Sequence, residues 1–218
     1  MNRQIIFTAD GSATVNLVGT AQSFHSRFGA LQESLHVFLD AGLKCFTHRD
    51  RVRVFEMGFG TGLNALLTGI FAEESKIEIF YETIEAFPLE QELIDGLNYD
   101  RIIPGAQPLF AQIHDCAWDK EVQLTDFFTL LKWNADLGTF RFEREFDLVY
   151  FDAFDPESQP ESWTAAVFNR IYGSMSDGGI LVTYSSKGSV RRAMEEAGLR
   201  VSKLTGPPHK KEIIRAVK

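Results

Sequence analysis

Residues 52–64 read VRVFEMGFGTGLN, a short apolar run that ends in a carboxylate and continues into three glycines spaced two residues apart. An apolar, helix-like run follows from Leu63. This order predicts a buried strand, a tight turn and a helix. Glycine permits positive φ and close approach of a ligand to the backbone, and the first turn of a helix offers unpaired N–H groups. The stretch therefore predicts a nucleotide-like cofactor site.

The glycine spacing and the carboxylate before it narrow the kind of cofactor. Gly58, Gly60 and Gly62 give G-x-G-x-G, whereas dinucleotide sites read G-x-G-x-x-G and place a pyrophosphate at the helix N-terminus. Glu56 precedes the first glycine by two residues, and its charge would repel a phosphate. It suits S-adenosylmethionine, which has a sulfonium and an amino group and no phosphate. The pattern resembles the first motif of class I methyltransferases; the alternative is a glycine-rich turn of another α/β protein.

Composition sets the broad class of the chain. Its 218 residues predict one domain, or one domain with an extension, and 44% apolar residues are ordinary for a globular protein. No run approaches the roughly 18–20 apolar residues of a membrane span, and the first residues lack the apolar core of a signal peptide. Cys45 and Cys116 are far apart, and the five histidines form no ligand cluster. We therefore expect a cytoplasmic protein without a metal or a membrane partner.

The charge is unevenly distributed along the chain. The net charge of −8 disfavours a nucleic-acid partner, but residues 187–218 hold nine Lys or Arg and three Glu, which gives +6 for that segment and −14 for the remainder. A basic end on an acidic body is suited to contact phosphate, and a solvated lysine-rich end is the alternative.

An N-terminal extension is expected over residues 1–50, before a sheet domain at residues 51–218. Asp10-Gly11 separates two alternating runs at residues 4–8 and 13–18, which predicts a β-hairpin. Apolar residues at helical spacing then predict a helix that ends near Gly42.

The remaining pattern predicts a mostly parallel α/β sheet. Further strands are expected over residues 76–85, 129–136, 146–151, 180–185, 199–204 and 212–217. Helices are expected from about 88 to 97, over 160–175, and from 190 to 197 with Ser189 as the cap; residues 98–128 are expected to form a helix and irregular connections. The last two strands are too close for a crossover helix, so they must form an antiparallel hairpin. A seven-stranded sheet finished in this way is typical of the Rossmann-like class I methyltransferase fold.

Several predicted strands end in carboxylates. In open α/β sheets the ligand crevice lies at the carboxyl ends of the strands. Glu82 and Glu85 are both candidates to bind the ribose hydroxyls, and Asp136 is a candidate to bind an adenine amino group. Asp152 is expected to lie at the reaction centre.

Four stretches then carry a resemblance to one family. The first stretch runs from Asp10-Gly11-Ser12 through Phe24-His25-Ser26 to His36-Val37-Phe38-Leu39; the second runs from Glu56 to Asn64, and the third is Glu85-Ala86-Phe87-Pro88-Leu89. The fourth begins with Asp152-Ala153-Phe154-Asp155-Pro156 and Pro160-Glu161-Ser162-Trp163-Thr164, and it continues through Lys187-Gly188-Ser189-Val190-Arg191-Arg192 to Gly206-Pro207-Pro208. In order and spacing the chain resembles the methyltransferase domain of the MnmC family of tRNA wobble-uridine enzymes, in a form without the oxidase half.

The resemblance implies a reaction and a set of site residues. The family transfers methyl from S-adenosylmethionine to the amine of 5-aminomethyl-(2-thio)uridine at the tRNA wobble position. It implies that Asp152 faces the amine. The cofactor would be held by Glu56, Gly58, Gly60, Gly62, Asn64, Glu85 and Asp136. The basic side chains expected to contact tRNA phosphates are Lys187, Arg191, Arg192, Lys210 and Lys211. A separate enzyme would supply the aminomethyl precursor.

The chain departs from the family pattern at some positions. Phe24 stands where tyrosine is usual, and Asn134-Ala135-Asp136 replaces a Gly-Asp step. Two other functions remain open at this point: a class I methyltransferase that acts on a small amine or another nucleoside, and a noncatalytic cofactor-binding module of an oxidase partner.

Overall fold

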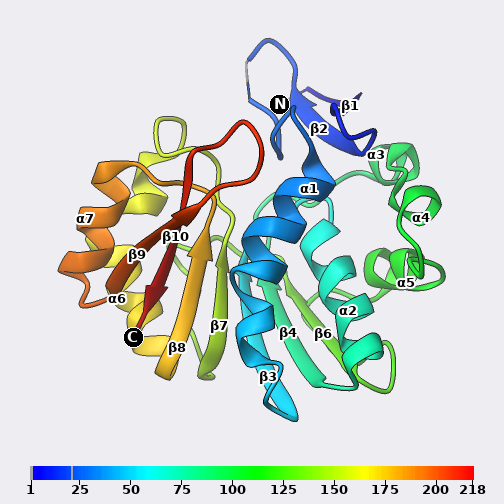
Figure 1. The fold of residues 1–218 in the computed structure, drawn as a ribbon. Helices are drawn as coiled ribbons and strands as arrows, with labels where there is room; N and C mark the ends of the chain where they lie inside the picture. Colours follow the sequence, from blue (N-terminus) through cyan, green and yellow to red (C-terminus); the bar gives the residue numbers. More distant parts are fainter. Residues whose placement is uncertain (1, 21) are drawn as a thin grey trace.

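The structure, a computed structural model, describes residues 2–20 and 22–218, which form a three-layer α/β domain with a small hairpin at one end (Figure 1). The strands are β1 (Arg3–Phe7), β2 (Ala13–Leu17), β3 (Arg51–Met57), β4 (Glu78–Ile84), β5 (Glu121–Gln123), β6 (Phe128–Trp133), β7 (Phe146–Phe151), β8 (Met175–Thr183), β9 (Arg200–Thr205) and β10 (Glu212–Val217). The helices are α1 (Ala30–Ser34), η1 (Leu35–Asp40), η2 (Leu43–Phe46), α2 (Leu63–Ser75), α3 (Gln91–Gly96), α4 (Tyr99–Ile102), α5 (Leu109–Asp115), η3 (Pro160–Trp163), α6 (Ala165–Ser174) and α7 (Gly188–Glu196).

The central sheet has the strand order β5-β6-β4-β3-β7-β8-β10-β9. Strands β6, β4, β3, β7 and β8 are parallel to one another, while β10 runs antiparallel to both β8 and β9. This confirms the expected fold class with its antiparallel C-terminal hairpin. The eighth strand was not expected: β5, which is only three residues long, pairs antiparallel with β6 inside the segment 98–128, where the sequence pattern is mixed. The same segment also folds into α4 and α5.

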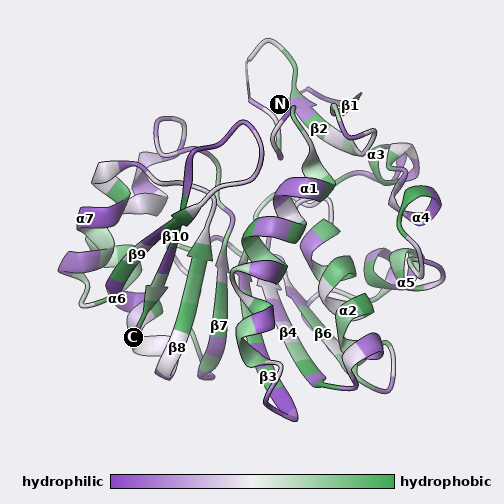
Figure 2. Cartoon of the chain, viewed as in Figure 1, coloured by the Kyte–Doolittle hydropathy of each residue, from purple (hydrophilic) through white to green (hydrophobic). Residues whose placement is uncertain are grey.

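Two apolar clusters cover the two faces of the sheet. One joins α2, α5 and η1 to one face, through residues such as Leu66, Ile113 and Phe38, and the other joins α6 and α7 to the opposite face through Phe168 and Val190. Figure 2 shows hydrophobic residues concentrated along the central strands between these helices. Both faces are covered, which is why the central strands read as nearly continuous apolar runs.

The N-terminal segment packs on the same core as the sheet. β1 and β2 form the expected antiparallel hairpin as a separate two-stranded sheet, with Ile5 opposite Val15. After it, Val37 and Phe38 of η1 join the cluster that covers the sheet, so this segment is held by buried contacts. The domain boundary at residue 50 stays a prediction.

Three local expectations were wrong. The strand expected over 129–136 ends at Trp133, so Asp136 lies in the following loop. The helix expected over 160–175 is two segments, η3 and α6, because Thr164 adopts an extended backbone and caps α6 through its side chain. Ser189 does not cap α7: the helix begins at Gly188 with Lys187 at the cap position, and no side chain accepts a capping hydrogen bond there.

Candidate functional site

The candidate site lies at the carboxyl end of β3, where the strand order reverses. β3 pairs with β4 on one side and with β7 on the other, and the loops that follow these strands carry the predicted site residues. A crevice at such a switch point is the usual ligand site of open α/β sheets. The N-terminal hairpin and the loop joining β9 to β10 stand at the same end of the sheet (Figure 1).

The glycine turn has the geometry that the sequence predicts. Gly58, Gly60 and Gly62 all have positive φ, of 91°, 53° and 73°. A Cβ atom at Gly58 would lie 3.1 Å from the carbonyl oxygen of Asp152, and one at Gly60 would lie 3.2 Å from the ring of Phe24. Side chains at these positions would therefore be strained and would crowd the crevice.

Glu85 is aimed at this turn. One carboxylate oxygen accepts a hydrogen bond from the Gly60 N–H (3.0 Å), and the other accepts from the Phe87 N–H (2.9 Å). Glu85 is partly exposed, so its carboxylate can accept further hydrogen bonds from a ligand. Glu82, the other candidate, is buried and accepts a hydrogen bond from the indole N–H of Trp133 (2.8 Å), with Arg144 beside it. The structure thus favours Glu85 over Glu82 for ligand contact.

Glu56 lies beneath the turn. Its side chain is completely buried, and Oε2 accepts a hydrogen bond from the Thr83 hydroxyl (2.9 Å), while Oε1 has no hydrogen-bond partner. Burial, and next the nearby charge of Asp152, raise the pKa of Glu56 well above its ordinary value. Asn64 Oδ1 is likewise buried without a partner. A proton on Glu56 would give this pair of acceptor atoms a donor.

Asp152 follows directly after β7, as expected. Its backbone N–H donates to the carbonyl of Met57 (3.2 Å), and its carboxylate accepts a hydrogen bond from the Asn64 amide (3.0 Å). Burial, followed by the negative charge of Glu33, raises the pKa of Asp152 to about 7. A carboxyl with such a pKa is suited to accept and release a proton near neutral pH.

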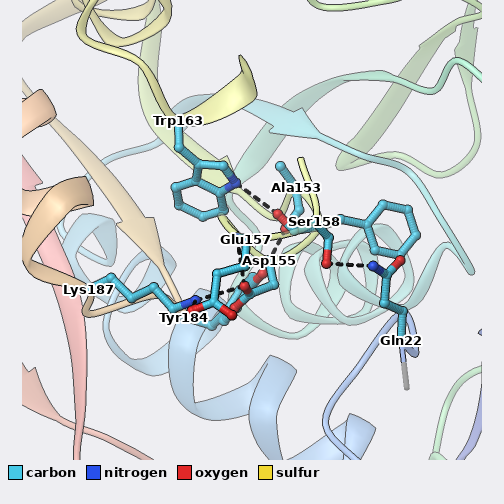
Figure 3. Close-up of polar contacts among 9 residues, drawn as sticks. Gln22, Ala153, Asp155, Glu157, Ser158, Trp163, Tyr184 and Lys187 are labelled. Carbon is cyan, nitrogen blue, oxygen red and sulfur yellow. Dashed lines mark hydrogen bonds and ion pairs between the residues drawn. The ribbon is translucent and has the colours of Figure 1, made fainter. Parts of the chain in front are cut away.

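The loop after β7 is held in place on both sides. The hydroxyl of Tyr184 donates to the Ala153 carbonyl (2.9 Å), and the indole N–H of Trp163 donates to the Phe154 carbonyl (2.8 Å) (Figure 3). Lys187 forms ion pairs of 2.8 Å with both Asp155 and Glu157. Figure 3 also shows Gln22 of the N-terminal segment hydrogen-bonded to Ser158, so the loop contacts both ends of the chain.

One buried carboxylate was missed by sequence reasoning. Glu33 lies within the first stretch of the family pattern, but the sequence predicts no function for it. In the structure it is a buried residue of α1, and its charge acts on Asp152. It accepts hydrogen bonds from the Ser26 N–H (2.9 Å) and from Lys210 (2.6 Å). The Lys210 ammonium also lies 4.4 Å from the ring centroid of Tyr184. The sequence does not indicate that Glu33 is buried, because its ion-pair partner Lys210 lies 177 residues away along the chain.

The predicted tRNA-contacting residues fall into two groups. Lys187 and Lys210 lie beside the crevice and are ion-paired to carboxylates of the site. Arg191, Arg192 and Lys211 are exposed, the two arginines on α7 and the lysine on the loop between β9 and β10. Arg191 is 3.8 Å from Glu195, one turn along the same helix.

Asp136 is exposed, and its carboxylate accepts a hydrogen bond from the Gly138 N–H (2.7 Å) within the loop after β6. Across residues 2–20 and 22–218, no group of three His, Cys, Asp or Glu side chains is arranged to hold a metal ion. In the same ranges no helix combines the length and the apolar character that a membrane span needs.

Comparison with known proteins shows which family the chain is similar to. Residues 111–218 match a family model described as S-adenosyl-L-methionine-dependent methyltransferase. The protein from Ectopseudomonas mendocina named tRNA 5-methylaminomethyl-2-thiouridine biosynthesis bifunctional protein MnmC is 30% identical over 205 residues, which cover 88% of this chain and 31% of that protein. The protein of the same name from Aromatoleum aromaticum is 29% identical over 97% of this chain and 35% of its own length. These matches support a methyltransferase domain of the MnmC type in this chain.

The chain spans about a third of the length of these MnmC relatives. Among solved structures, MNMC2 from Aquifex aeolicus superposes with a TM-score of 0.84 at 24% identity, over 99% of this chain and 70% of that one. Spermidine synthase from Thermotoga maritima follows with a TM-score of 0.57 at 14% identity, over 99% and 68% of the two chains. Both likenesses agree with the methyltransferase fold described above.

Proposed function

We propose that this chain transfers the methyl group of S-adenosylmethionine to the amine of 5-aminomethyl-(2-thio)uridine at the tRNA wobble position. The observation that carries the proposal is Asp152, a carboxylate with a pKa of about 7 at the mouth of the glycine-turn crevice. Its place in the family pattern matches the names of the MnmC relatives, which are tRNA 5-methylaminomethyl-2-thiouridine biosynthesis proteins.

The residues at the crevice fit the proposed cofactor. The side chains that face the region are mainly acidic, with Glu85 on one side and Asp152 on the other, and the turn has no room for side chains. This charge suits a cation that lacks phosphate. The turn at Gly58, Gly60 and Gly62 would hold the methionine part, Glu85 the ribose hydroxyls, and Asp136 the adenine amino group. When bound, S-adenosylmethionine supplies a methyl group activated by its sulfonium.

Glu56 and Asn64 act as supports in this proposal. Glu56 has no exposed surface, so it reaches the crevice through Asn64, which lies next to it and donates to Asp152. The amide of Asn64 thereby fixes the orientation of the Asp152 carboxylate. Precise placement of this kind is worth more than strong binding, because methyl transfer needs nitrogen, carbon and sulfur in line.

Asp152 would prepare the acceptor. A primary alkylamine is protonated at neutral pH, with lysine near 10.4 as the reference, and an ammonium has no lone pair with which to attack. The ionised Asp152 binds the ammonium, takes one proton from it and leaves the neutral amine. The new N–C bond forms as the S–C bond breaks, and the proton on Asp152 passes to water after the product leaves.

A transfer assay on defined tRNA tests the proposal. Purified chain and labelled S-adenosylmethionine are incubated with tRNA that carries 5-aminomethyluridine, and the nucleosides are separated after digestion. We expect label in 5-methylaminomethyluridine derivatives and none in tRNA that lacks the aminomethyl group. Cofactor binding without label in any tRNA would contradict the proposal and favour a small-molecule amine as acceptor, or a noncatalytic role beside an oxidase.

A further inference from the structure

A small hollow lies between the N-terminal segment and the loop joining β9 to β10. Its volume is about 130 Å³, and its lining includes Ser26, Phe28, Glu33, Pro207, His209 and Lys210. Two segments that are far apart in the sequence therefore build one cavity. Figure 1 shows the two segments at the end of the sheet where the parallel strands finish.

One wall of the hollow is aromatic. The rings of Phe28 and His209 are stacked with centroids 4.4 Å apart and planes 17° apart. Phe28 remains 54% exposed although His209 is stacked on it, so part of its ring is open to solvent. Exposed aromatic rings are the platforms on which proteins stack unpaired nucleic-acid bases.

The polar part of the hollow is one ion pair. Glu33 and Lys210 are joined at 2.6 Å, and they offer a hydrogen-bond acceptor next to a donor. Uracil presents the complementary pair on its edge, with the N3–H as donor and O4 as acceptor. Contacts connect the hollow to the loop of the proposed catalytic carboxylate: the Lys210 ammonium lies 4.4 Å from the ring centroid of Tyr184, whose hydroxyl donates to the carbonyl of Ala153, the residue after Asp152.

Backbone hydrogen bonds fix the loop that forms one wall of the hollow. Gly206 and Lys211 close the loop through a backbone hydrogen bond of 3.1 Å, and Lys210 donates its N–H to the Pro207 carbonyl (2.9 Å). A Cβ atom at Gly206 would lie 2.3 Å from the Lys210 carbonyl oxygen, so the turn needs glycine there. His209 is held at a φ of 68°, a conformation that asparagine also tolerates.

We propose that this hollow is the pocket for the wobble base, which stacks on an open face of the ring pair of Phe28 and His209 and is read at its edge by Glu33 and Lys210. Its volume of about 130 Å³ is close to the roughly 150 Å³ of a cavity known to hold one benzene ring, so its size matches a single six-membered ring. The C5 atom of uracil neighbours C4, so an aminomethyl arm lies on the O4 side of the ring. The inference rests on the proposed function and adds the base-binding residues to it.

Kinetics on an anticodon stem-loop RNA with 5-aminomethyluridine at the wobble position tests the pocket. For Phe28→Ala and His209→Asn we expect the KM for RNA to rise between about 5- and 150-fold, the range that corresponds to 1–3 kcal/mol of stacking. The affinity for S-adenosylmethionine should stay the same. Phe28→Trp should retain the wild-type KM because it keeps a stacking surface. The matched control is Phe7→Ala, which removes a phenylalanine that is 67% exposed on β1.

A photocrosslink gives a second readout that needs no turnover. The same stem-loop with 5-iodouridine at the wobble position is irradiated with the protein, and the attached peptide is identified by mass spectrometry. We expect attachment within residues 26–33 or 207–211. Attachment elsewhere, or variants with the wild-type KM, would overturn the pocket while methyl transfer by the unaltered chain upholds the proposed function. Absence of transfer combined with the expected crosslink would overturn the function and uphold the pocket.

Discussion

At the scale of single residues, two carboxyls with raised pKa values define the site: Glu56 is completely buried and Asp152 is half-buried. Asp152 sits at the crevice, and Glu56 lies beneath it with one oxygen unpartnered. After burial itself, the negative charge of Asp152 is the next cause of the raised pKa of Glu56. Strongly shifted carboxyls of this kind are characteristic of functional sites.

Replacement of Asp152 by Asn should change the pH dependence of methyl transfer. In the unaltered chain, activity should rise with pH as Asp152 ionises and level off above about 7, because the carboxylate then takes the proton of the acceptor. Asp152→Asn cannot take it, so activity should fall roughly 10²-fold or more and keep rising with pH toward the amine's own pKa. The measurement is kcat/KM for RNA between pH 5.5 and 9 (about the range in which proteins stay folded). A variant profile that levels off near 7 would contradict this role.

Replacement of Glu56 by Gln should stabilise the fold. The raised pKa means that the folded chain keeps a proton which the unfolded chain releases above its ordinary value of 4.5, so stability is lost as pH rises above that value. Glu56→Gln removes this loss, and its amide can donate to the unpartnered Asn64 oxygen. We expect a gain in the free energy of unfolding, measured with urea, of about 1 kcal/mol at pH 8, the net contribution of one hydrogen bond, and a smaller gain at pH 5. Lower stability of the variant at pH 8 would refute this.

At the scale of elements, the turn between β3 and α2 shapes the crevice. Its three glycines bring the backbone against the Asp152 carbonyl and the Phe24 ring, and its helix begins without a side-chain cap. The unpaired N–H groups of a helix start are thus left for a ligand or water.

Replacement of Gly60 by Ala should weaken cofactor binding. The new methyl group would lie 3.2 Å from the Phe24 ring. The alanine would also have to keep the backbone φ of 53°, which costs an L-residue about 1–2 kcal/mol. We expect a loss of stability of that size and at least a tenfold higher Kd for S-adenosylmethionine, by calorimetry. Gly178→Ala is the matched control, because Gly178 also has positive φ (75°) but has open space around its Cβ position. An equal loss of cofactor affinity in both variants would contradict the crevice assignment.

At the scale of the whole molecule, the two ends of the chain meet beside the crevice. Glu33 pairs with Lys210, Phe28 stacks on His209, and the His36 ring contacts the Thr205 carbonyl at 2.8 Å. Lys187 and Lys210 are thereby committed to carboxylates. Of the five basic residues predicted to contact RNA phosphates, Arg191, Arg192 and Lys211 are the exposed ones.

Neutralising these three side chains should weaken RNA binding in a salt-dependent way. For the triple variant with glutamine at 191, 192 and 211, we expect the slope of log K against log salt to fall by about 0.7–0.9 for each phosphate contact that is lost. Filter binding of tRNA at several salt concentrations measures it. The control is Arg51→Gln with Arg53→Gln, which removes two exposed cations from β3, Arg51 at its start and Arg53 two residues on, away from the crevice at its carboxyl end. An unchanged slope in the triple variant would place the RNA elsewhere.

The sequence by itself determined the features that depend on near neighbours in the chain. The strand, glycine turn and helix at 52–67, the Asp-Gly hairpin and the C-terminal antiparallel pair are each set by local periodicity and turn chemistry, and the structure contains all of them. The strand β5 was not predicted, because a run of three residues is too short to indicate a strand and becomes one by pairing with the edge of β6. The end of β6 escaped as well, since the sequence pattern continues past Trp133 into the loop.

Only the tertiary structure decided which polar groups meet. Glu85 reaches the turn while Glu82, three residues earlier in the same strand and loop, is buried on the opposite side with Trp133. Glu33 becomes a site residue through Lys210, and the hollow beside them exists because residues 26–33 and 207–210 are folded against each other. Desolvation and the charge of distant neighbours set the pKa values of Asp152 and Glu56. These are properties of distance in space, which a pattern along one chain does not encode.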